Sequence, residues 1–266
     1  MSSKDKETVG NFVVSKDGLM TRREVLMMGA AAAVTTGLTA SAVHAAAPTV
    51  TTAAPAAGGK DVYVARDFSA LVAKKMDGLS ANQIEQHLKL YKGYVTKSNE
   101  IMSKIKEVDI STANATYSPL RELLMEQSFA VNGAIYHELY FGNLGGAGGE
   151  PTGDLKAAMD ETFGTTGKFM DFLKASGKSM RGWVVVGLNQ RGNRIDTFGL
   201  DTHNMWSPAG FIPLLVLDVY EHAYMIDYAI DRAKYLDAFV KNIDWNVVSK
   251  RFAAASKYPT GLDLTV

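Results

Sequence analysis

Apolar residues at helical spacing begin soon after residue 61 and predict the first helices of the fold. Ser80, followed three positions later by Gln83, is typical of a helix N-terminus, because the serine side chain can accept a hydrogen bond from the third helical amide. The sequence therefore predicts a long helix over 81–108. The apolar positions before it are Phe68, Leu71, Val72, Met76 and Leu79.

A second long helix is predicted over 120–143, after a polar break at 111–118. Gly145 and Gly146 end it, since glycine readily adopts the left-handed backbone that closes a helix. The glycine-rich stretch 145–153 follows. A phosphate-binding loop would follow a strand and precede a Lys-Ser or Lys-Thr pair, and this stretch does neither. We therefore interpret it as a boundary between two domains.

Apolar runs in the second half of the chain predict three strands. Residues 182–188 and 194–198 flank a turn-forming segment at 189–193, which is typical of a hairpin. A third run, at 213–217, suits a strand that is covered on both faces. Helical patterns precede the sheet over 155–175 and follow it from residue 227 onward.

These elements predict an α+β fold, with an N-terminal long helical hairpin and a C-terminal α/β domain that contains a three-stranded antiparallel sheet. The predicted divisions are a signal peptide over 1–47, a flexible linker over 48–61, the hairpin domain over 62–147 and a C-terminal α+β domain over 148–266.

The composition excludes several kinds of chemistry. The 266 residues contain no cysteine, which rules out disulfides, thiolate metal sites and cysteine nucleophiles. The 28 basic and 28 acidic residues balance, so no nucleic-acid partner is expected from the total charge. A metal ion would have to be held by His, Asp, Glu or water, and the chain has five histidines.

The N-terminal segment has the pattern of an export signal. Arg22 and Arg23 precede a modestly apolar run over 25–42, an arrangement that resembles a twin-arginine signal, and small residues over 42–47 offer a cleavage site. A membrane anchor is the alternative, although the run is barely long enough for it. The prediction is a periplasmic or otherwise exported protein with no stable membrane association after cleavage, carried by a route that transports folded proteins.

A carboxylate interrupts the third apolar run. Asp218 stands near the end of the run 213–219, and His222 follows four residues later with Glu221 beside it. An aspartate in such a run is not explained by packing. Where a strand turns into a helix, a carboxylate oxygen and an imidazole nitrogen held this close can bind one metal ion.

The segment 218–228 reads D-V-Y-E-H-A-Y-M-I-D-Y and resembles the C-terminal metal motif of the iron/manganese superoxide dismutase family, D-V-W-E-H-A-Y-x-x-D-Y. Tyr220 is the one departure. Three further stretches resemble family motifs: 84–87 (I-E-Q-H) with Tyr94, 136–141 (Y-H-E-L-Y-F) and 148–153 (G-G-E-P-T-G).

The resemblance implies the metal ligands His87, His137, Asp218 and His222, with one iron or manganese ion per subunit. It makes 148–266 the metal-binding domain in the predicted division. His87 shares a helix face with Tyr91 and Tyr94, at spacings of four and three residues.

The resemblance also implies an activity, the disproportionation of superoxide to dioxygen and hydrogen peroxide. Tyr94 would stand at the open side of the metal and His203 in its outer shell, both passing protons. Arg232 would attract the superoxide anion. Glu221 would reach the His222 ligand of a second subunit, so a homodimer is expected.

Several departures from the family leave alternatives open. The interval from His87 to Tyr94 is one residue short, Leu90 and Tyr91 occupy the region of the channel histidine, and Phe141 replaces a tryptophan. With Tyr220 and Val185, these changes favour a second hypothesis: an exported metal-binding or interaction protein on the same scaffold without dismutase activity. A purely structural helical protein is the third. Gly133 stands where manganese members often carry a glycine and iron members a glutamine, and it fits an outer-shell group supplied from the other side, here His203. The choice between iron and manganese stays open, because this group is a histidine in place of a glutamine.

Overall fold

The computed structural model describes residues 12–15, 18–21, 61–205 and 208–257. The chain divides into two units, Met1–Ala57 and Gly58–Val266. In the first, β1 (Phe12–Ser15) and β2 (Gly18–Thr21) pair as an antiparallel hairpin, which the sequence did not predict. The arginine pair, the apolar run and the cleavage region of the predicted signal peptide lie outside the described residues, as does nearly all of the linker.

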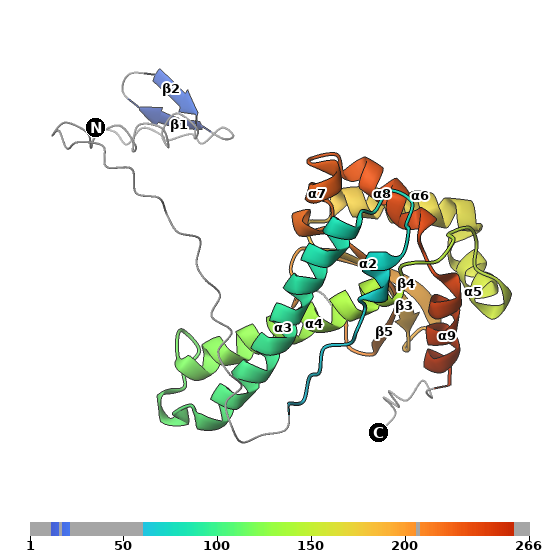
Figure 1. The fold of residues 1–266 in the computed structure, drawn as a ribbon. Helices are drawn as coiled ribbons and strands as arrows, with labels where there is room; N and C mark the ends of the chain where they lie inside the picture. The colour runs from blue at the N-terminus through green and yellow to red at the C-terminus, as the bar shows by residue number, and fades with distance from the viewer. Residues whose placement is uncertain (1–11, 16–17, 22–60, 206–207, 258–266) are drawn as a thin grey trace, which may run out of the picture. The chain divides into compact units, whose positions relative to one another are not determined.

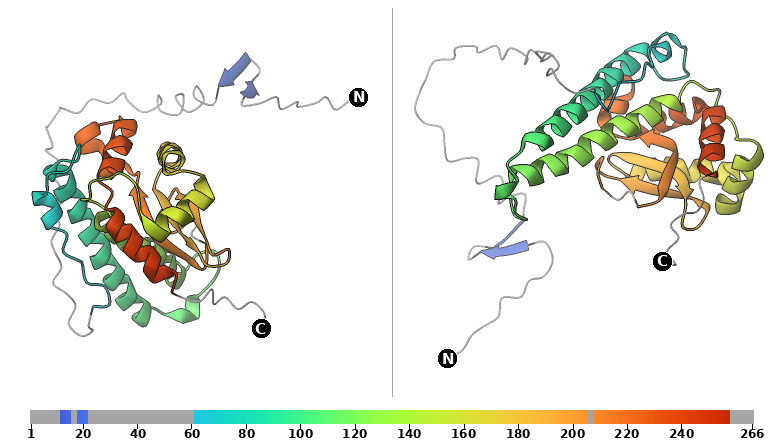
Figure 2. Two further views of the ribbon diagram at one scale, coloured as in Figure 1. Left: turned by 90° about the vertical axis from the view of Figure 1, so that its right-hand side faces the viewer. Right: turned by 90° about the horizontal axis from the view of Figure 1, so that it is seen from below.

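Two long helices form the predicted hairpin of the second unit. A short helix, α2 (Ala70–Ala73), precedes α3 (Ala81–Glu107), and α4 (Pro119–Gly142) packs alongside α3 after the 3-10 turn η1 (Ile110–Thr112). Figures 1 and 2 show α3 and α4 side by side in all views. Both helices begin at a serine whose hydroxyl accepts a backbone amide hydrogen bond, Gln83 N to Ser80 and Arg121 N to Ser118. The predicted helical hairpin is confirmed to within two residues at each end.

The three predicted strands form one antiparallel sheet in the order β4-β3-β5. They are β3 (Trp183–Asn189), β4 (Arg194–Leu200) and β5 (Phe211–Asp218). The central strand pairs Trp183 with Leu200 on one side and with Asp218 on the other, and a bulge interrupts the β3–β5 pairing at Val186/Gly187. Helix α4 contacts β5, which brings the hairpin onto the sheet edge that ends at Asp218.

The remaining helices are shorter than the sequence pattern predicted. The single helix expected over 155–175 is two, α5 (Gly153–Phe163) and α6 (Thr166–Ser179), because Gly164 adopts φ +85° and the side chain of Thr165 accepts a hydrogen bond from Lys168 N. After the 3-10 turn η2 (Glu221–Ala223), the C-terminal region divides into α7 (Met225–Tyr228), α8 (Arg232–Lys241) and α9 (Trp245–Ala255).

The glycine-rich loop lies between α4 and α5 and is held against the α8–α9 connection. Gly146 N donates to Asn242 O and Gly148 N donates to Ile243 O. A Cβ atom on Gly146 would lie 2.2 Å from Ile243 O, so a side chain could not fit there. The loop thus lies within the unit Gly58–Val266, and the division into domains at 147/148 stays a prediction. None of the helices in the described part of the chain has the length and apolar character needed to cross a membrane.

Candidate metal centre

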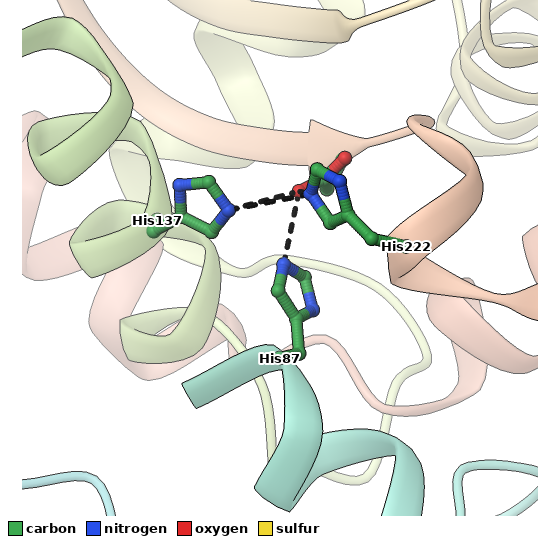
Figure 3. A group of neighbouring side chains, drawn as sticks. His87, His137 and His222 are labelled. Atoms are coloured by element: carbon green, nitrogen blue, oxygen red, sulfur yellow. Dashed lines mark hydrogen bonds and ion pairs between the residues drawn. The ribbon is translucent and has the colours of Figure 1, made fainter. Parts of the chain in front are cut away.

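Four side chains from separate elements converge at one point between the hairpin and the sheet. His87 comes from the first half of α3, His137 from α4, Asp218 from the last position of β5 and His222 from η2. Each offers one donor atom, and these atoms all lie within 4.8 Å of one another. Figure 3 shows the three imidazoles pointing at a common carboxylate oxygen. The structure therefore assembles all four predicted ligands.

The carboxylate of Asp218 is at the middle of this group. Its Oδ2 lies 3.1 Å from His87 Nε2, 3.2 Å from His222 Nε2 and 3.6 Å from His137 Nε2. Its other oxygen, Oδ1, accepts a hydrogen bond from Tyr220 N, and its main-chain oxygen accepts one from the hydroxyl of Tyr235. These bonds hold the carboxylate in one orientation with Oδ2 toward the imidazoles.

Burial determines the protonation of the group. It lowers the pKa of His87 and holds the pKa of His137 well below the usual range, so both imidazoles stay neutral near pH 7. Burial alone would raise the pKa of Asp218, but the attraction of His222 and the hydrogen bonds from His222 and His87 outweigh it and lower that pKa. The site thus combines an ionised carboxylate with neutral imidazoles at His87 and His137.

This donor set fits a metal ion. His137 Nδ1 donates to Gly133 O at 2.5 Å, which leaves Nε2 of the neutral ring with its lone pair toward the centre. A buried carboxylate beside such a lone pair favours a bound cation, because an unneutralised buried charge is costly. Nitrogen and oxygen donors without thiolate suit iron or manganese.

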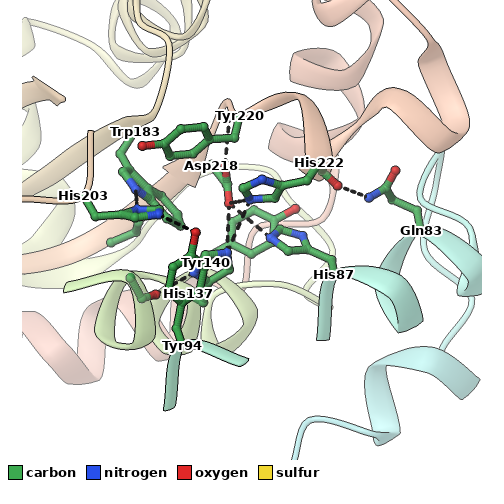
Figure 4. A network of polar contacts seen from close by, with 12 residues as sticks. Gln83, His87, Tyr94, His137, Tyr140, Trp183, His203, Asp218, Tyr220 and His222 are labelled. Carbon is green, nitrogen blue, oxygen red and sulfur yellow. Dashed lines mark hydrogen bonds and ion pairs between the residues drawn. The ribbon is translucent and has the colours of Figure 1, made fainter. Parts of the chain in front are cut away.

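A hydrogen-bonded chain lies next to the four ligands. Trp183 Nε1 donates to His203 Nδ1 at 2.8 Å, and His203 Nε2 lies 2.8 Å from the hydroxyl oxygen of Tyr94 (Figure 4). Because an indole nitrogen can only donate, His203 Nδ1 must be the acceptor, so the proton of the neutral ring sits on Nε2. Burial lowers the pKa of His203 to about 4, which keeps the ring neutral. His203 therefore donates to Tyr94, and the Tyr94 O–H is left free to donate into the site.

Comparison with known proteins agrees with this geometry. The C-terminal domain of iron/manganese superoxide dismutases matches residues 151–251. An iron superoxide dismutase of Aquifex aeolicus is 45% identical over 192 residues, which cover 70% of this chain and 90% of the relative. An iron enzyme of Cupriavidus metallidurans is 37% identical over 68% of this chain and 92% of its own length, and a manganese enzyme of Mycobacterium intracellulare is 35% identical over 66% and 85%.

The chain belongs to the iron/manganese superoxide dismutase family. Iron or manganese is accordingly the cofactor class of the centre, and the four residues that the family motifs indicated form its candidate ligand set. The fold of the family, helices with a three-stranded antiparallel sheet, is the fold described above.

The departures from the family motifs leave the centre lined with aromatic rings. Tyr220 stacks on the His222 ring at 5.1 Å between centroids, and Phe141 meets the His87 ring edge-on at 4.8 Å. Tyr91 is fully buried, and its hydroxyl donates to Glu138 Oε1 at 2.8 Å. The substituted positions therefore still pack against the candidate ligands, of which His87, His137 and Asp218 are buried.

Gly133 makes room for the ring of Tyr94, because a Cβ atom on Gly133 would lie 2.7 Å from Tyr94 Cδ1. The sequence suggested that this glycine fits an outer-shell group supplied from the other side by His203, and His203 lies 2.8 Å from the Tyr94 hydroxyl. The glycine lets Tyr94 lie over the His137 ring, with the ring centroids 5.2 Å apart. The shortened interval between His87 and Tyr94 thus still delivers the tyrosine to the centre.

Glu221 and Arg232 lie apart from this network. Glu221 is exposed in the single chain. The Arg232 guanidinium donates to the carbonyl oxygens of Met180 and Gly177 at the end of α6 and to the hydroxyl of Tyr224. Arg232, Glu221 and Lys178 line a surface hollow of about 290 Å³. The attraction of superoxide by Arg232 stays a prediction.

Two residues of the centre were missed by the sequence reasoning. The sequence pattern places Trp183 only in a strand, whereas in the structure its N–H determines the tautomer of His203. The pattern gives Gln83 only a place in a helix cap, whereas in the structure its amide donates to His222 O. A fully buried Trp or Gln must find a polar partner, but the sequence does not say which one.

Proposed function

We propose that this chain is a superoxide dismutase that converts two superoxide anions and two protons into dioxygen and hydrogen peroxide. The observation that carries the proposal is the convergence of His87, His137, His222 and Asp218 beside a tyrosine whose hydroxyl is free to donate. A bound iron or manganese ion would supply the reversible one-electron change that the reaction needs.

The residues around the centre have separate tasks in this reaction. Tyr94 presents its O–H to the site, where it can donate a proton to a reduced oxygen species. His203 holds the tyrosine oxygen by donating Nε2–H to it, and Trp183 holds His203. The buried aromatic rings keep bulk water from the ligands. Arg232 and Lys178 are the candidates for attracting the anion.

Superoxide consumption by protein loaded separately with iron and with manganese tests the proposal. Relatives of both metal types match the chain, so each metal needs its own preparation. We expect catalysis in at least one, and its loss in Asp218→Asn. If both loaded proteins bind metal and neither removes superoxide, the chain is the metal-binding protein without dismutase activity. The hydrogen bond between His203 and Tyr94 supports the dismutase over that alternative.

A homodimer is part of the proposal. His222 is partly exposed, and Glu221 lies beside three exposed apolar side chains, Met225, Ile226 and Ile230. A second copy would cover them and bring its own Glu221 to the exposed edge of His222. Sedimentation at micromolar concentration tests this: we expect a dimer for the wild type and weaker association for Glu221→Ala. Sedimentation of wild type as a monomer would contradict it.

Export through the twin-arginine route is the last part of the proposal. It is supported by Arg22 and Arg23 before the apolar run and by the small residues over 42–47 that offer a cleavage site. In a fractionated bacterial host, we expect the protein in the periplasm and the double substitution Arg22→Lys, Arg23→Lys in the cytoplasm. Lys16→Arg is the matched control. Equal distribution of the three proteins would contradict the proposal.

A further inference from the structure

The N-terminus of α3 is hydrogen-bonded to the turn that carries His222. Ser80 caps the helix through Gln83 N, as the sequence predicts. In a capping box the Gln side chain would then return to the Ser80 amide. Here Ser80 N donates instead to Asp227 Oδ2 at 2.7 Å, and the Gln83 side chain crosses to the segment 222–226. The Ser80 amide and the Gln83 side chain, which would bond each other in a capping box, therefore both bond the segment 222–227 that begins with the metal-ligand turn.

The Gln83 amide is inserted into a backbone hydrogen bond. In an α-helix, Ile226 N would donate directly to His222 O, four residues earlier. Instead, Ile226 N donates to Gln83 Oε1 at 3.2 Å and Gln83 Nε2 donates to His222 O at 2.6 Å. The side chain is fully buried, and both of its polar atoms have partners. The chain consequently forms the 3-10 turn η2 at Glu221–Ala223, and helix α7 begins only at Met225.

His222 is the ligand with the weakest support from its own element. The side chains of His87, His137 and Asp218 are fully buried, whereas that of His222 is 29% exposed. His87 and His137 project from long helices and Asp218 from the end of β5, where it pairs with Trp183 of the central strand, but His222 lies in a three-residue turn. A ligand in a short turn needs a contact from elsewhere to keep its ring direction.

We propose that Gln83 is a positioning residue for His222: its amide, bridging His222 O and Ile226 N, keeps the turn open and directs the imidazole to the metal (Figure 4). The inference rests on the proposed function, because it concerns the same metal centre. The proposal adds Gln83 to the residues that shape the metal centre, although Gln83 is 139 positions away from His222 in the sequence and is not a metal ligand.

The test compares Gln83→Met with Gln86→Met. Methionine has a similar length and can neither donate nor accept at the two positions, so the bridge is lost with little change in volume. Gln86 lies on the exposed side of the same helix, one turn from the bridge, and is the matched control. The measurements are the rate of metal release from iron- or manganese-loaded protein to a chelator, and the visible and paramagnetic resonance spectra of the loaded protein.

We expect Gln83→Met to release metal about tenfold faster or more and to show an altered spectrum, since outer partners of ligating histidines have effects of this size. Gln86→Met should match the wild type in both. A Gln83→Met protein with wild-type release and spectrum would overturn the proposal. A merely structural role would lower thermal stability and leave the spectrum unchanged, which would also overturn it.

Hydrogen exchange on the wild type covers the case in which Gln83→Met does not fold. The Ile226 amide has no backbone acceptor among the described residues, so slow exchange requires the Gln83 bridge; rapid exchange would refute the bridge. These readouts do not use superoxide. If the loaded wild type failed to consume superoxide, the proposed function would fail while the role of Gln83 was still decided by metal release.

Discussion

Trp183 Nε1 donates a hydrogen bond to His203 Nδ1 at 2.8 Å. This one contact places the proton of His203 on the opposite nitrogen, where it points at Tyr94, and so sets which way the hydrogen bonds of the outer network run. The Tyr94 hydroxyl is a donor to the metal centre only because His203 is a donor to Tyr94.

Removal of the Trp183 indole N–H is expected to change the direction of these hydrogen bonds, because either nitrogen of His203 can then carry the proton. Trp183→Phe should lower kcat/KM for superoxide by about tenfold, which is the scale found for outer partners of metal ligands. Stopped-flow kinetics measures it. Trp245→Phe is the control, since it also removes an indole N–H, bonded to Gly149 O in the glycine-rich loop. Equal rates for both variants would contradict the role of Trp183.

A methyl group at Gly133 is expected to push Tyr94 away from the centre. The added Cβ would lie 2.7 Å from the tyrosine ring, so Gly133→Ala should lower the free energy of unfolding by about 1–3 kcal/mol and reduce activity. Gly93→Ala is the control, because no atom lies within 4 Å of its Cβ position in the same helical hairpin. That change should raise stability by about 0.5–1 kcal/mol. Denaturant unfolding of the metal-free proteins decides it, and equal stabilities would refute the contact.

Acid should destabilise the metal-free protein through His203. The pKa of His203 is about 4 in the folded chain, against 6.5 for an ordinary histidine. As the pH falls below 6.5, His203 becomes protonated in the unfolded chain but stays neutral in the folded chain. The free energy of unfolding therefore decreases until about pH 4. The slope approaches about 1.4 kcal/mol per pH unit for this group.

His203→Gln isolates this effect. Glutamine does not titrate, yet it can accept from Trp183 and donate to Tyr94. The contributions of His87 and His137 are common to both proteins and cancel in the comparison. The variant should therefore lose less stability than the wild type between pH 6.5 and 4 in denaturant titrations. Parallel curves for the two proteins would show that His203 is not held neutral by burial.

Metal binding should stabilise the fold, and the stabilisation should depend on Asp218. A ligand that binds only the folded state adds about 2.7 kcal/mol at a hundred times its dissociation constant. Removal of iron or manganese should lower the unfolding temperature of the wild type. Asp218→Asn should show no such difference, because the one anionic ligand is lost. Asp196→Asn is the control, since Asp196 pairs with Arg194 on β4. A metal-dependent rise that survives in Asp218→Asn would contradict the ligand assignment.

Arg232 anchors the end of α6, and its proposed attraction of the anion can be tested separately. Arg232→Gln removes both, whereas Lys178→Gln removes a positive charge from the same hollow without the carbonyl contacts of Arg232. If charge matters, both variants should lower kcat/KM at low ionic strength, and the deficit should shrink as salt screens the charge. A salt-independent loss confined to Arg232→Gln would assign the residue to anchoring alone.

The sequence by itself determined most of the elements, and its resemblance to the family motifs indicated the four candidate ligands. The two long helices, the three strands and the histidines could be predicted because periodicity, caps and turn residues act over a few positions, and because the motif around Asp218 and His222 is continuous in the chain. The breaks at Gly164 and after α7 were missed, since one left-handed residue can end a helix whose apolar pattern continues.

Only the tertiary structure decided which polar groups meet. Gln83 had a local partner available in Ser80 and instead bonds the His222 turn, and the space beside Gly133 is filled by the ring of Tyr94, which the sequence did not indicate. A helical pattern tells which face a side chain occupies, whereas its partner depends on how helices and sheet pack against one another. A buried polar group must be satisfied, but packing alone selects the atom that satisfies it.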